Sequence, residues 1–340
     1  MKINIHLRTY VAAIFALVII GLTSVISIAI SNQSSDILKK EIGHTLSTTA
    51  FQMADKLDYF MWSRIAEIEV ISELDLLKNQ QNNKEARKLL NEVQSSIPAF
   101  SWIGLTDSDG KVVVATNDIL TGVDISMRPV FKEALSGTFI GDVHDAVLLA
   151  KLLPNSNGEP LQFVDISKPI ISNDGEFLGV LASHLSWKWS EQVHDEIISP
   201  LKDEMEDAQV FIISQKDQTV LLGPRGMVGT SVQLGSINKA RKGKTSWLVE
   251  EWPDGDKYLT GYSLGDGYLN YKGLGWVTIV RIPAEKAFSP VRDLQLFIIK
   301  IGIVSSLIFA WIGWFLTGFV TRPLQKISES ANQIRSGGGQ

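Results

Sequence analysis

The sequence predicts an α+β fold in which one long helix carries two stacked antiparallel sheets, flanked by two membrane-spanning helices. Three observations support this prediction. Two uncharged, apolar stretches, at residues 10–30 and 301–321, each match the roughly 20 residues that cross a bilayer. Apolar residues recur every three or four positions from residue 37, which is typical of a helix. After residue 99 the pattern changes to short apolar runs separated by turns, which is typical of strands.

Composition narrows the class of protein. The chain has 340 residues, and 45% of them are hydrophobic, which is high for a wholly soluble protein of this length. A net charge of −5 argues against nucleic acid as a partner. The absence of cysteine excludes disulfides, thiolate metal ligands and a cysteine nucleophile.

The charges beside the two apolar stretches predict their orientation. Lys2 and Arg8 precede the first stretch, and Arg322, Lys326 and Arg335 follow the second. Positive charge collects on the cytoplasmic side, so both termini should be cytoplasmic. We expect a cytoplasmic segment at 1–9, spanning helices at 10–30 and 296–320, and an extracytoplasmic region at 31–293. A cleaved signal peptide is the alternative for the first stretch, although its apolar run exceeds the usual length of about 7–15 residues.

The extracytoplasmic region divides into a helical part, 31–95, and two modules with the same order of elements. Each module shows a hairpin, a short helix and a second hairpin. The membrane-distal module covers 99–190 and the membrane-proximal module 208–284. The expected elements are a helix at 83–93 ending before Pro98; strands at 102–105, 112–114, 163–171 and 177–185 with a helix at 129–135; and strands at 210–213, 220–222, 247–251, 258–262 and 276–282 with a helix at 237–242.

Several phrases in this region resemble a known family. They are WIGLTD from Trp102, RPVF from Arg128, GDVHD from Gly141 and LLAKLLP from Leu148. Together with the order of elements, they resemble the double Cache sensor domain of bacterial transmembrane receptors, many of them diguanylate cyclases or phosphodiesterases. The resemblance covers 31–293. It implies two PAS-like modules, a small-molecule ligand in the distal one, a homodimer, and a receptor in the bacterial inner membrane with its sensor domain in the periplasm.

The segment 321–340 resembles the start of a HAMP relay module, beginning at Thr321, Arg322, Pro323 and Leu324. Apolar positions there are spaced three, four and three residues apart, as in a helix that packs against partner helices. These positions are Leu324, Ile327, Ala331 and Ile334. An ordinary amphipathic juxtamembrane helix is the alternative. Because no output domain follows, we expect a piece of a longer receptor or a chain that relays through a downstream partner.

The distal module holds the candidate ligand-binding residues. Arg128 precedes a short helix, where guanidinium and helix end could hold an anion, or it could pair with Asp124. Trp102 and Phe131 could line the cavity or belong to the core. The predicted site consists of Trp102, Arg128, Phe131, Asp142, His144, Asp145, Asp165 and His184.

The polar members of this set each have an alternative interpretation. Asp165 shares a strand face with Phe163, so its carboxylate should be buried and should need a partner, either a ligand amine or Arg128. The resemblance places Asp142, His144 and Asp145 in a lid over the ligand, although Asp142 could simply cap a turn. His184 could be a core histidine or a ligand contact whose binding depends on pH.

The resemblance also implies a departure in specificity. Amino-acid-sensing members follow their arginine with a tryptophan-tyrosine pair and end the last strand with an aspartate. Here Pro129, Val130 and Phe131 follow Arg128, and His184 takes the place of the aspartate. Free α-amino acids are therefore less strongly indicated, and a small anionic or differently substituted metabolite is as plausible a ligand.

The sequence shows no sign of catalysis or of a cofactor. There is no phosphate-binding loop with its lysine and no Gly-x-Ser-x-Gly motif. No two histidines have metal-ligand spacing, and Asp142, His144 and Asp145 fit a solvated loop better than a metal site. We expect a receptor that is not an enzyme and has no cofactor or metal. A membrane-tethered solute-binding module without output, or a histidine kinase or chemoreceptor input, remains open.

Overall fold

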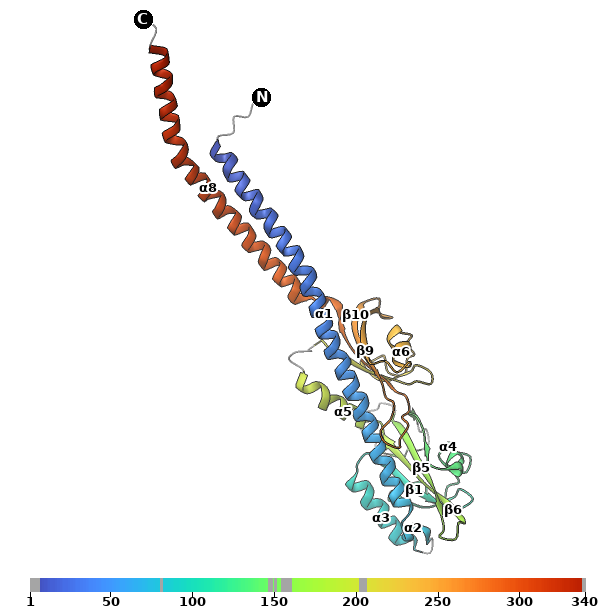
Figure 1. Ribbon diagram of the computed structural model, residues 1–340. Helices are drawn as coiled ribbons and strands as arrows, with labels where there is room; N and C mark the ends of the chain where they lie inside the picture. The colour runs from blue at the N-terminus through green and yellow to red at the C-terminus, as the bar shows by residue number, and fades with distance from the viewer. Residues whose placement is uncertain are drawn as a thin grey trace. The chain divides into compact units, whose positions relative to one another are not determined.

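The computed structural model describes residues 7–79, 82–145, 149, 152–153, 161–201 and 207–337 (Figure 1). The chain forms two compact units, one of Met1–Ile42 with Glu285–Gln340 and one of Gly43–Ala284. Helix α1 is Leu7–Ser72 and helix α8 is Ser289–Gly337. Both are long and apolar enough to cross a membrane, α8 over Ser289–Thr317. The predicted spans therefore fit the structure, and the crossing itself stays a prediction.

Small residues of α8 lie at its contact with α1 in the first unit. A Cβ atom added at Gly302 would lie 2.2 Å from Thr23, and one added at Gly313 would lie 2.9 Å from Phe15. The Ser306 hydroxyl donates to the Ala16 carbonyl at 3.5 Å. Close backbone approach through glycine and hydrogen-bonding hydroxyls is typical of helix pairs in lipid.

Lys2 and the side chains of the predicted seam from Leu324 to Ile334 lie outside the described part of the chain.

In the second unit, α1 buries the apolar face that its periodicity predicts. Seven side chains spaced three or four residues apart are 0–4% exposed, which confirms the prediction for this part of the helix. They are Leu46, Ala50, Met53, Leu57, Met61, Ile65 and Ile68. The helical region expected at 31–95 is divided, because α1 ends at Ser72 and is followed by α2 (Asp75–Lys78) and α3 (Asn83–Ser96).

The distal module is one antiparallel sheet with strand order β2-β1-β6-β5-β3, and β4 also pairs with β5. Its hairpin turn is built by Asp107, whose Oδ1 accepts from the N–H groups of Asp109 and Lys111 at 3.1 and 2.8 Å. The expected elements are present, with ends that match or differ by at most three residues. They are β1 (Phe100–Thr106), β2 (Val112–Ala115), α4 (Pro129–Lys132), β5 (Gln162–Ile171) and β6 (Phe177–Ser186). Two short strands, β3 (Phe139–Ile140) and β4 (His144–Asp145), were not predicted.

The proximal module repeats this topology with strand order β8-β7-β11-β10-β9, so the predicted repeat of architecture is confirmed. Figure 1 shows the two sheets one after the other along α1. Gly261 of β10 lets α1 approach closely, since an added Cβ would lie 2.3 Å from the Leu46 backbone. The elements are β7 (Gln209–Ile213), β8 (Val220–Leu222), α6 (Gly235–Ala240), β9 (Ser246–Glu251), β10 (Lys257–Leu264) and β11 (Val277–Pro283).

A buried arginine lies inside the proximal module. The Arg281 guanidinium carbon is 3.9 Å from the Trp252 ring centroid and 3.8 Å from that of Tyr258. Its Nε donates to Gln209 at 2.8 Å, and Asp254 lies 3.4 Å away. Burial lowers the pKa of Arg281. The aromatic rings and these oxygens together compensate the buried charge.

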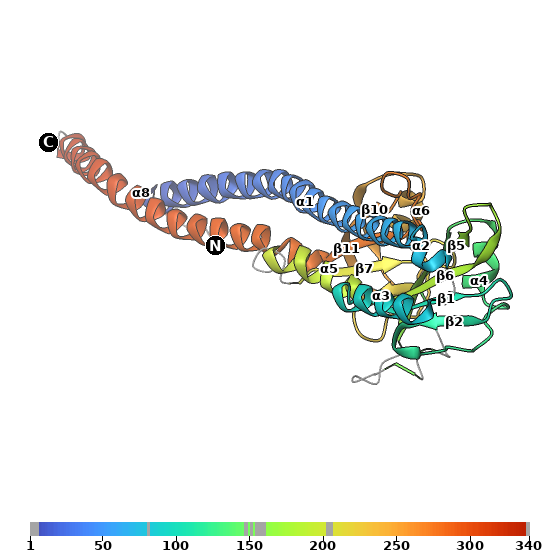
Figure 2. The same cartoon turned by 90° about the horizontal axis from the view of Figure 1, so that it is seen from below.

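Aromatic side chains join the two modules. Trp187 packs edge-on against Trp276 of the proximal module, with ring centroids 4.8 Å apart, and its Nε1–H donates to the Leu221 carbonyl at 2.9 Å. Trp189, 5.3 Å from Trp187, begins helix α5 (Trp189–Ile198). The sequence indicated only a boundary there, because few residues of α5 are apolar. Seen from below in Figure 2, α5 and α3 follow one another along α1.

Candidate ligand-binding site

A cavity of about 700 Å³ lies beside the distal sheet, at its junction with the proximal module. Seven of the eight predicted site residues line it, and Phe131 does not. The cavity is also lined by apolar side chains and by residues of the β7–β8 turn. The lining includes Trp102, Arg128, Asp142, His144, Asp145, Asp165 and His184, together with Leu120, Ile125, Phe139, Leu149, Ser214, Lys216, Asp217 and Thr219.

Strand register places the main polar residues in one row across the sheet. Trp102 of β1 is opposite His184 of β6, and His184 is opposite Asp165 of β5. His144 of β4 is opposite Phe163, two residues from Asp165 on the same face of β5. Antiparallel pairing brings directly opposite side chains within about 5 Å. Four strands therefore gather an indole, two imidazoles and a carboxylate on one wall of the cavity.

Asp165 is buried and faces the two histidines, as the alternation along its strand predicts. Its Oδ1 lies 2.5 Å from His184 Nδ1, and its Oδ2 lies 3.6 Å from His144 Nε2. The His184 ring is 5.5 Å from the Trp102 ring and 6.1 Å from the His144 ring. The partner expected for Asp165 was a ligand amine or Arg128, and the structure places His184 and His144 beside it instead.

Arg128 lies at the start of α4 and lines the cavity with an exposed side chain. Asp124, the alternative partner, instead accepts from the backbone N–H of Ser126 at 2.8 Å, and hydrogen bonds from Ser126 lower its pKa. Within the described residues, Arg128 forms no ion pair. Its guanidinium is therefore available to an anionic group.

The two aromatic candidates have different positions. Phe131 belongs to the distal hydrophobic core and packs against Phe177, with ring centroids 6.4 Å apart. Trp102 is fully buried, and its Nε1–H donates to the Ile119 carbonyl at 2.9 Å, but its ring also faces the cavity. Phe131 is therefore a core residue, which was one of the two alternatives that the sequence left open. Trp102 belongs to the core and also lines the cavity.

Asp142 connects the distal module to the proximal one. Its Oδ1 accepts from Trp276 Nε1–H at 2.7 Å, and its Oδ2 accepts from the Ser214 hydroxyl at 3.0 Å. Oδ1 also accepts from the Val143 N–H at 2.8 Å, which is the turn cap that the sequence offered as an alternative. The carboxylate is thus already occupied by three protein donors.

The proximal module contributes to the cavity, which the sequence did not indicate. Lys216, Asp217 and Thr219 of the β7–β8 turn line it. The hydrogen bond from the Thr219 N–H to Asp217, at 3.0 Å, lowers the pKa of Asp217, so this carboxylate stays ionised. The turn itself was predicted, and only the packing of the two modules shows that it reaches the cavity. Arg128 and Lys216 supply positive charge to the lining, and Asp145, Asp165 and Asp217 supply carboxylates, so the cavity offers partners for both signs of charge.

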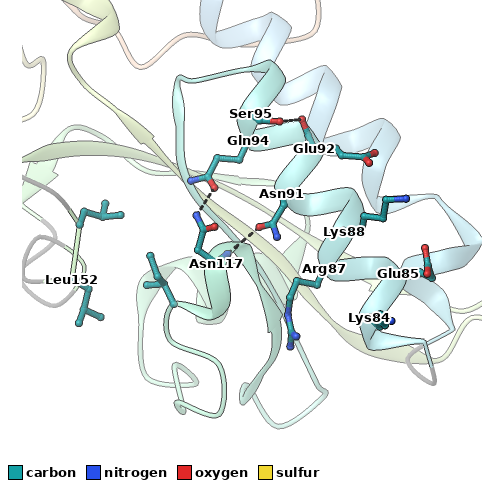
Figure 3. A pocket seen from close by; sticks show the side chains of 12 residues that line it. Lys84, Glu85, Arg87, Lys88, Asn91, Glu92, Gln94, Ser95, Asn117 and Leu152 are labelled. Atoms are coloured by element: carbon teal, nitrogen blue, oxygen red, sulfur yellow. Dashed lines mark hydrogen bonds between the residues drawn. The ribbon is translucent and has the colours of Figure 1, made fainter.

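A second, larger hollow of about 1070 Å³ runs along α3 (Figure 3). Lys84, Glu85 and Lys88 line it with exposed side chains, and Asn117 bonds to Asn91 and Gln94 at 3.0 and 3.1 Å. Its polar groups are solvated or bonded to each other. We prefer the smaller cavity, because it alone of the two is lined by a buried carboxylate.

Two antiparallel sheets along one helix, with a mixed-charge cavity in the first, define a ligand-binding sensor domain. A family model described as Cache domain (dCache_1) matches residues 34–291. The chain therefore belongs to the Cache domain family, as the resemblance predicted.

Solved structures of low identity share this fold. The amino acid chemoreceptor PctC of Pseudomonas aeruginosa PAO1, in complex with GABA, has a TM-score of 0.53 and 18% identity, covering 71% of this chain and 99% of that one. The chemoreceptor PctB of the same organism, in complex with L-Arg, has a TM-score of 0.52 and 20% identity, covering 73% and 98%. An extracellular ligand binding receptor from Desulfohalobium retbaense DSM5692 has a TM-score of 0.53 and 12% identity, covering 70% of this chain but 40% of that one. No curated protein matches the chain.

Proposed function

We propose that this chain is the sensor part of a transmembrane signal-transduction receptor, and that the cavity of its distal module binds a small extracytoplasmic molecule. The observation that carries the proposal is the cavity of about 700 Å³ with the buried Asp165 on its wall. A volume of this size suits a small metabolite, and ligand pockets combine apolar side chains with fixed polar groups that orient the ligand.

Charge supports a ligand that carries an anionic group. Arg128 is exposed to the cavity without an ion pair among the described residues, and Lys216 lies on the same lining. A planar guanidinium binds carboxylate or phosphate in a two-point geometry. The PctC and PctB structures are complexes with GABA and L-Arg, and a ligand that also has a cationic group would find Asp145 and Asp217 here.

Signal relay belongs to the same proposal. The receptor lies in the bacterial inner membrane with both termini cytoplasmic, pairs as a homodimer, and passes a small displacement of α8 to a HAMP-type coil that begins at Pro323. The cytoplasmic output is a diguanylate cyclase, phosphodiesterase, histidine kinase or chemotaxis partner. Arg128 and that coil belong to different units of the chain, so we expect variants of one to leave the function of the other intact.

A thermal-shift screen of the purified full chain in detergent tests ligand binding. A compound present at about 100 times its dissociation constant adds ~2.7 kcal/mol of stability. We expect the shift to be lost in Arg128→Ala and kept in Lys132→Ala, which removes an exposed cation from the same helix without touching the cavity. Equal shifts for wild type and Arg128→Ala would remove Arg128 from the site.

A further inference from the structure

Three potential ligand atoms for a metal ion meet on the wall of the distal cavity. His144, Asp165 and His184 each offer one such atom, and all three atoms lie within 4.8 Å of one another. They come from three adjacent strands, β4, β5 and β6, whose register places them side by side. Residues on strands are held more precisely than residues on loops, as a coordination site requires.

The atoms of this cluster are not satisfied by one another. Asp165 Oδ1 and His184 Nδ1 are 2.5 Å apart, yet neither forms a hydrogen bond of acceptable geometry within the described residues. The side chain of Asp165 is only 7% exposed, and that of His184 is 12% exposed. A buried carboxylate without a hydrogen-bond donor is costly. A bound cation that both atoms face would remove this cost.

The donor set favours a transition metal. Two imidazole nitrogens and one carboxylate oxygen suit zinc, nickel or iron, whereas magnesium and calcium prefer oxygen ligands alone. Ligand atoms about 2.0–2.2 Å from a tetrahedral zinc ion are roughly 3.3 Å apart. The 3.6 Å distance between Asp165 and His144 is close to that value. The contact between Asp165 and His184 would widen by roughly 0.8 Å to admit the ion.

We propose that His144, Asp165 and His184 bind one divalent transition-metal ion, with a coordination position left open toward the cavity. His144 is 39% exposed and lines that cavity, so a water molecule or an anionic donor atom of the ligand can reach the ion. Three protein ligands with one open position is the arrangement of zinc sites that bind a further molecule. This inference rests on the proposed function, because the ion would take part in holding the sensed molecule.

The test is metal titration of the full chain, purified in detergent through a tag without histidine and treated with a chelator. Zinc binding is followed by calorimetry and cobalt binding by its visible spectrum. We expect one ion per chain for wild type, and affinity reduced at least about tenfold in His144→Ala and in His184→Gln. His194→Ala is the matched control, since His194 lies beside Asp195 at 2.9 Å on the surface and should bind like wild type.

The outcomes separate this proposal from the proposed function. Wild-type binding that persists in both His144→Ala and His184→Gln, or no binding at all, overturns the metal site. Circular dichroism checks folding, and the more exposed His144 variant decides the result if His184→Gln misfolds. An organic ligand could raise the melting temperature of the metal-free wild type but not of Arg128→Ala, while zinc does not bind. That result would support the proposed sensor function and contradict the metal site.

Discussion

Among single residues, Asp58 on α1 is a buried acid whose pKa is raised. It is 2% exposed, and its Oδ2 accepts from the Gly267 N–H at 2.8 Å. Burial raises the pKa of Asp58 to about 6, with smaller contributions from Asp266 and Asp55, while the bond from Gly267 opposes the shift. The nearby Tyr271 has its pKa raised by the same burial. Stability of the sensor unit should therefore depend on pH through Asp58.

The direction in which pH changes the free energy of unfolding follows from proton binding to Asp58. Folded Asp58 holds its proton to higher pH than the unfolded chain, whose ordinary value is 3.8. Its contribution is therefore fully present below about pH 4 and lost as pH rises through about 6, a change of about 3 kcal/mol. We expect Asp58→Asn to lack this pH-dependent contribution to the free energy of unfolding, and to be more stable than wild type at pH 7. Melting temperatures followed by tryptophan fluorescence between pH 4 and 7 check this. Parallel curves for the two proteins would contradict it.

At the scale of elements, the segment between β3 and β4 is tied to the proximal module. Asp142 receives hydrogen bonds from Trp276, just before β11, and from Ser214, just after β7. Asp145, three residues further along the chain in β4, is exposed. One wall of the cavity is thus held in place by contacts that cross between modules.

Removing that connection should destabilise the sensor unit. Asp142→Ala leaves the buried Trp276 N–H without its acceptor, which costs about 1–3 kcal/mol. Asp142→Asn keeps an acceptor oxygen and should cost less. Denaturant unfolding of both variants measures the difference, with Asp145→Ala as the control that changes an exposed carboxylate nearby. If Asp142→Ala unfolds at the wild-type midpoint, the connection is not stabilising.

For the molecule as a whole, the proposed receptor function requires that α1 and α8 cross the membrane. The apolar faces of α1 and α8 carry many exposed side chains, including Leu17 and Leu307 at 68% each, which lipid would cover. Because the chain has no cysteine, single cysteines report on topology without background.

We expect opposite labelling at two positions. A membrane-impermeant maleimide should label Lys244→Cys in intact spheroplasts, and should label Ser336→Cys only after permeabilisation. Residue 244 is exposed in the proximal module, whereas residue 336 follows the second predicted span. Protection of Lys244→Cys in intact spheroplasts would place the sensor on the wrong side of the membrane.

Most of the fold was predictable from local patterns. The period of α1 gave its buried face from Leu46 to Ile68, and alternation with turn residues gave both sheets and their repeated order. Those signals lie within a few neighbouring residues, so they survive without tertiary contacts. Helix α5 was missed because its pattern is mostly polar. The separate helix at 83–93 was predicted, but the short helix α2 that precedes it was not.

Local patterns and the family resemblance were enough to establish the α+β class, the two apolar helices, the family and seven of the residues around the cavity. What those residues contact follows from the folded arrangement alone. It paired Asp165 with His184 and His144, engaged Asp142 with Trp276, moved Phe131 into the core, and brought Lys216 to the cavity wall. The reason is physical: each of these contacts joins residues distant in sequence, and strand register and module packing set them, neither of which leaves a periodic trace along the chain.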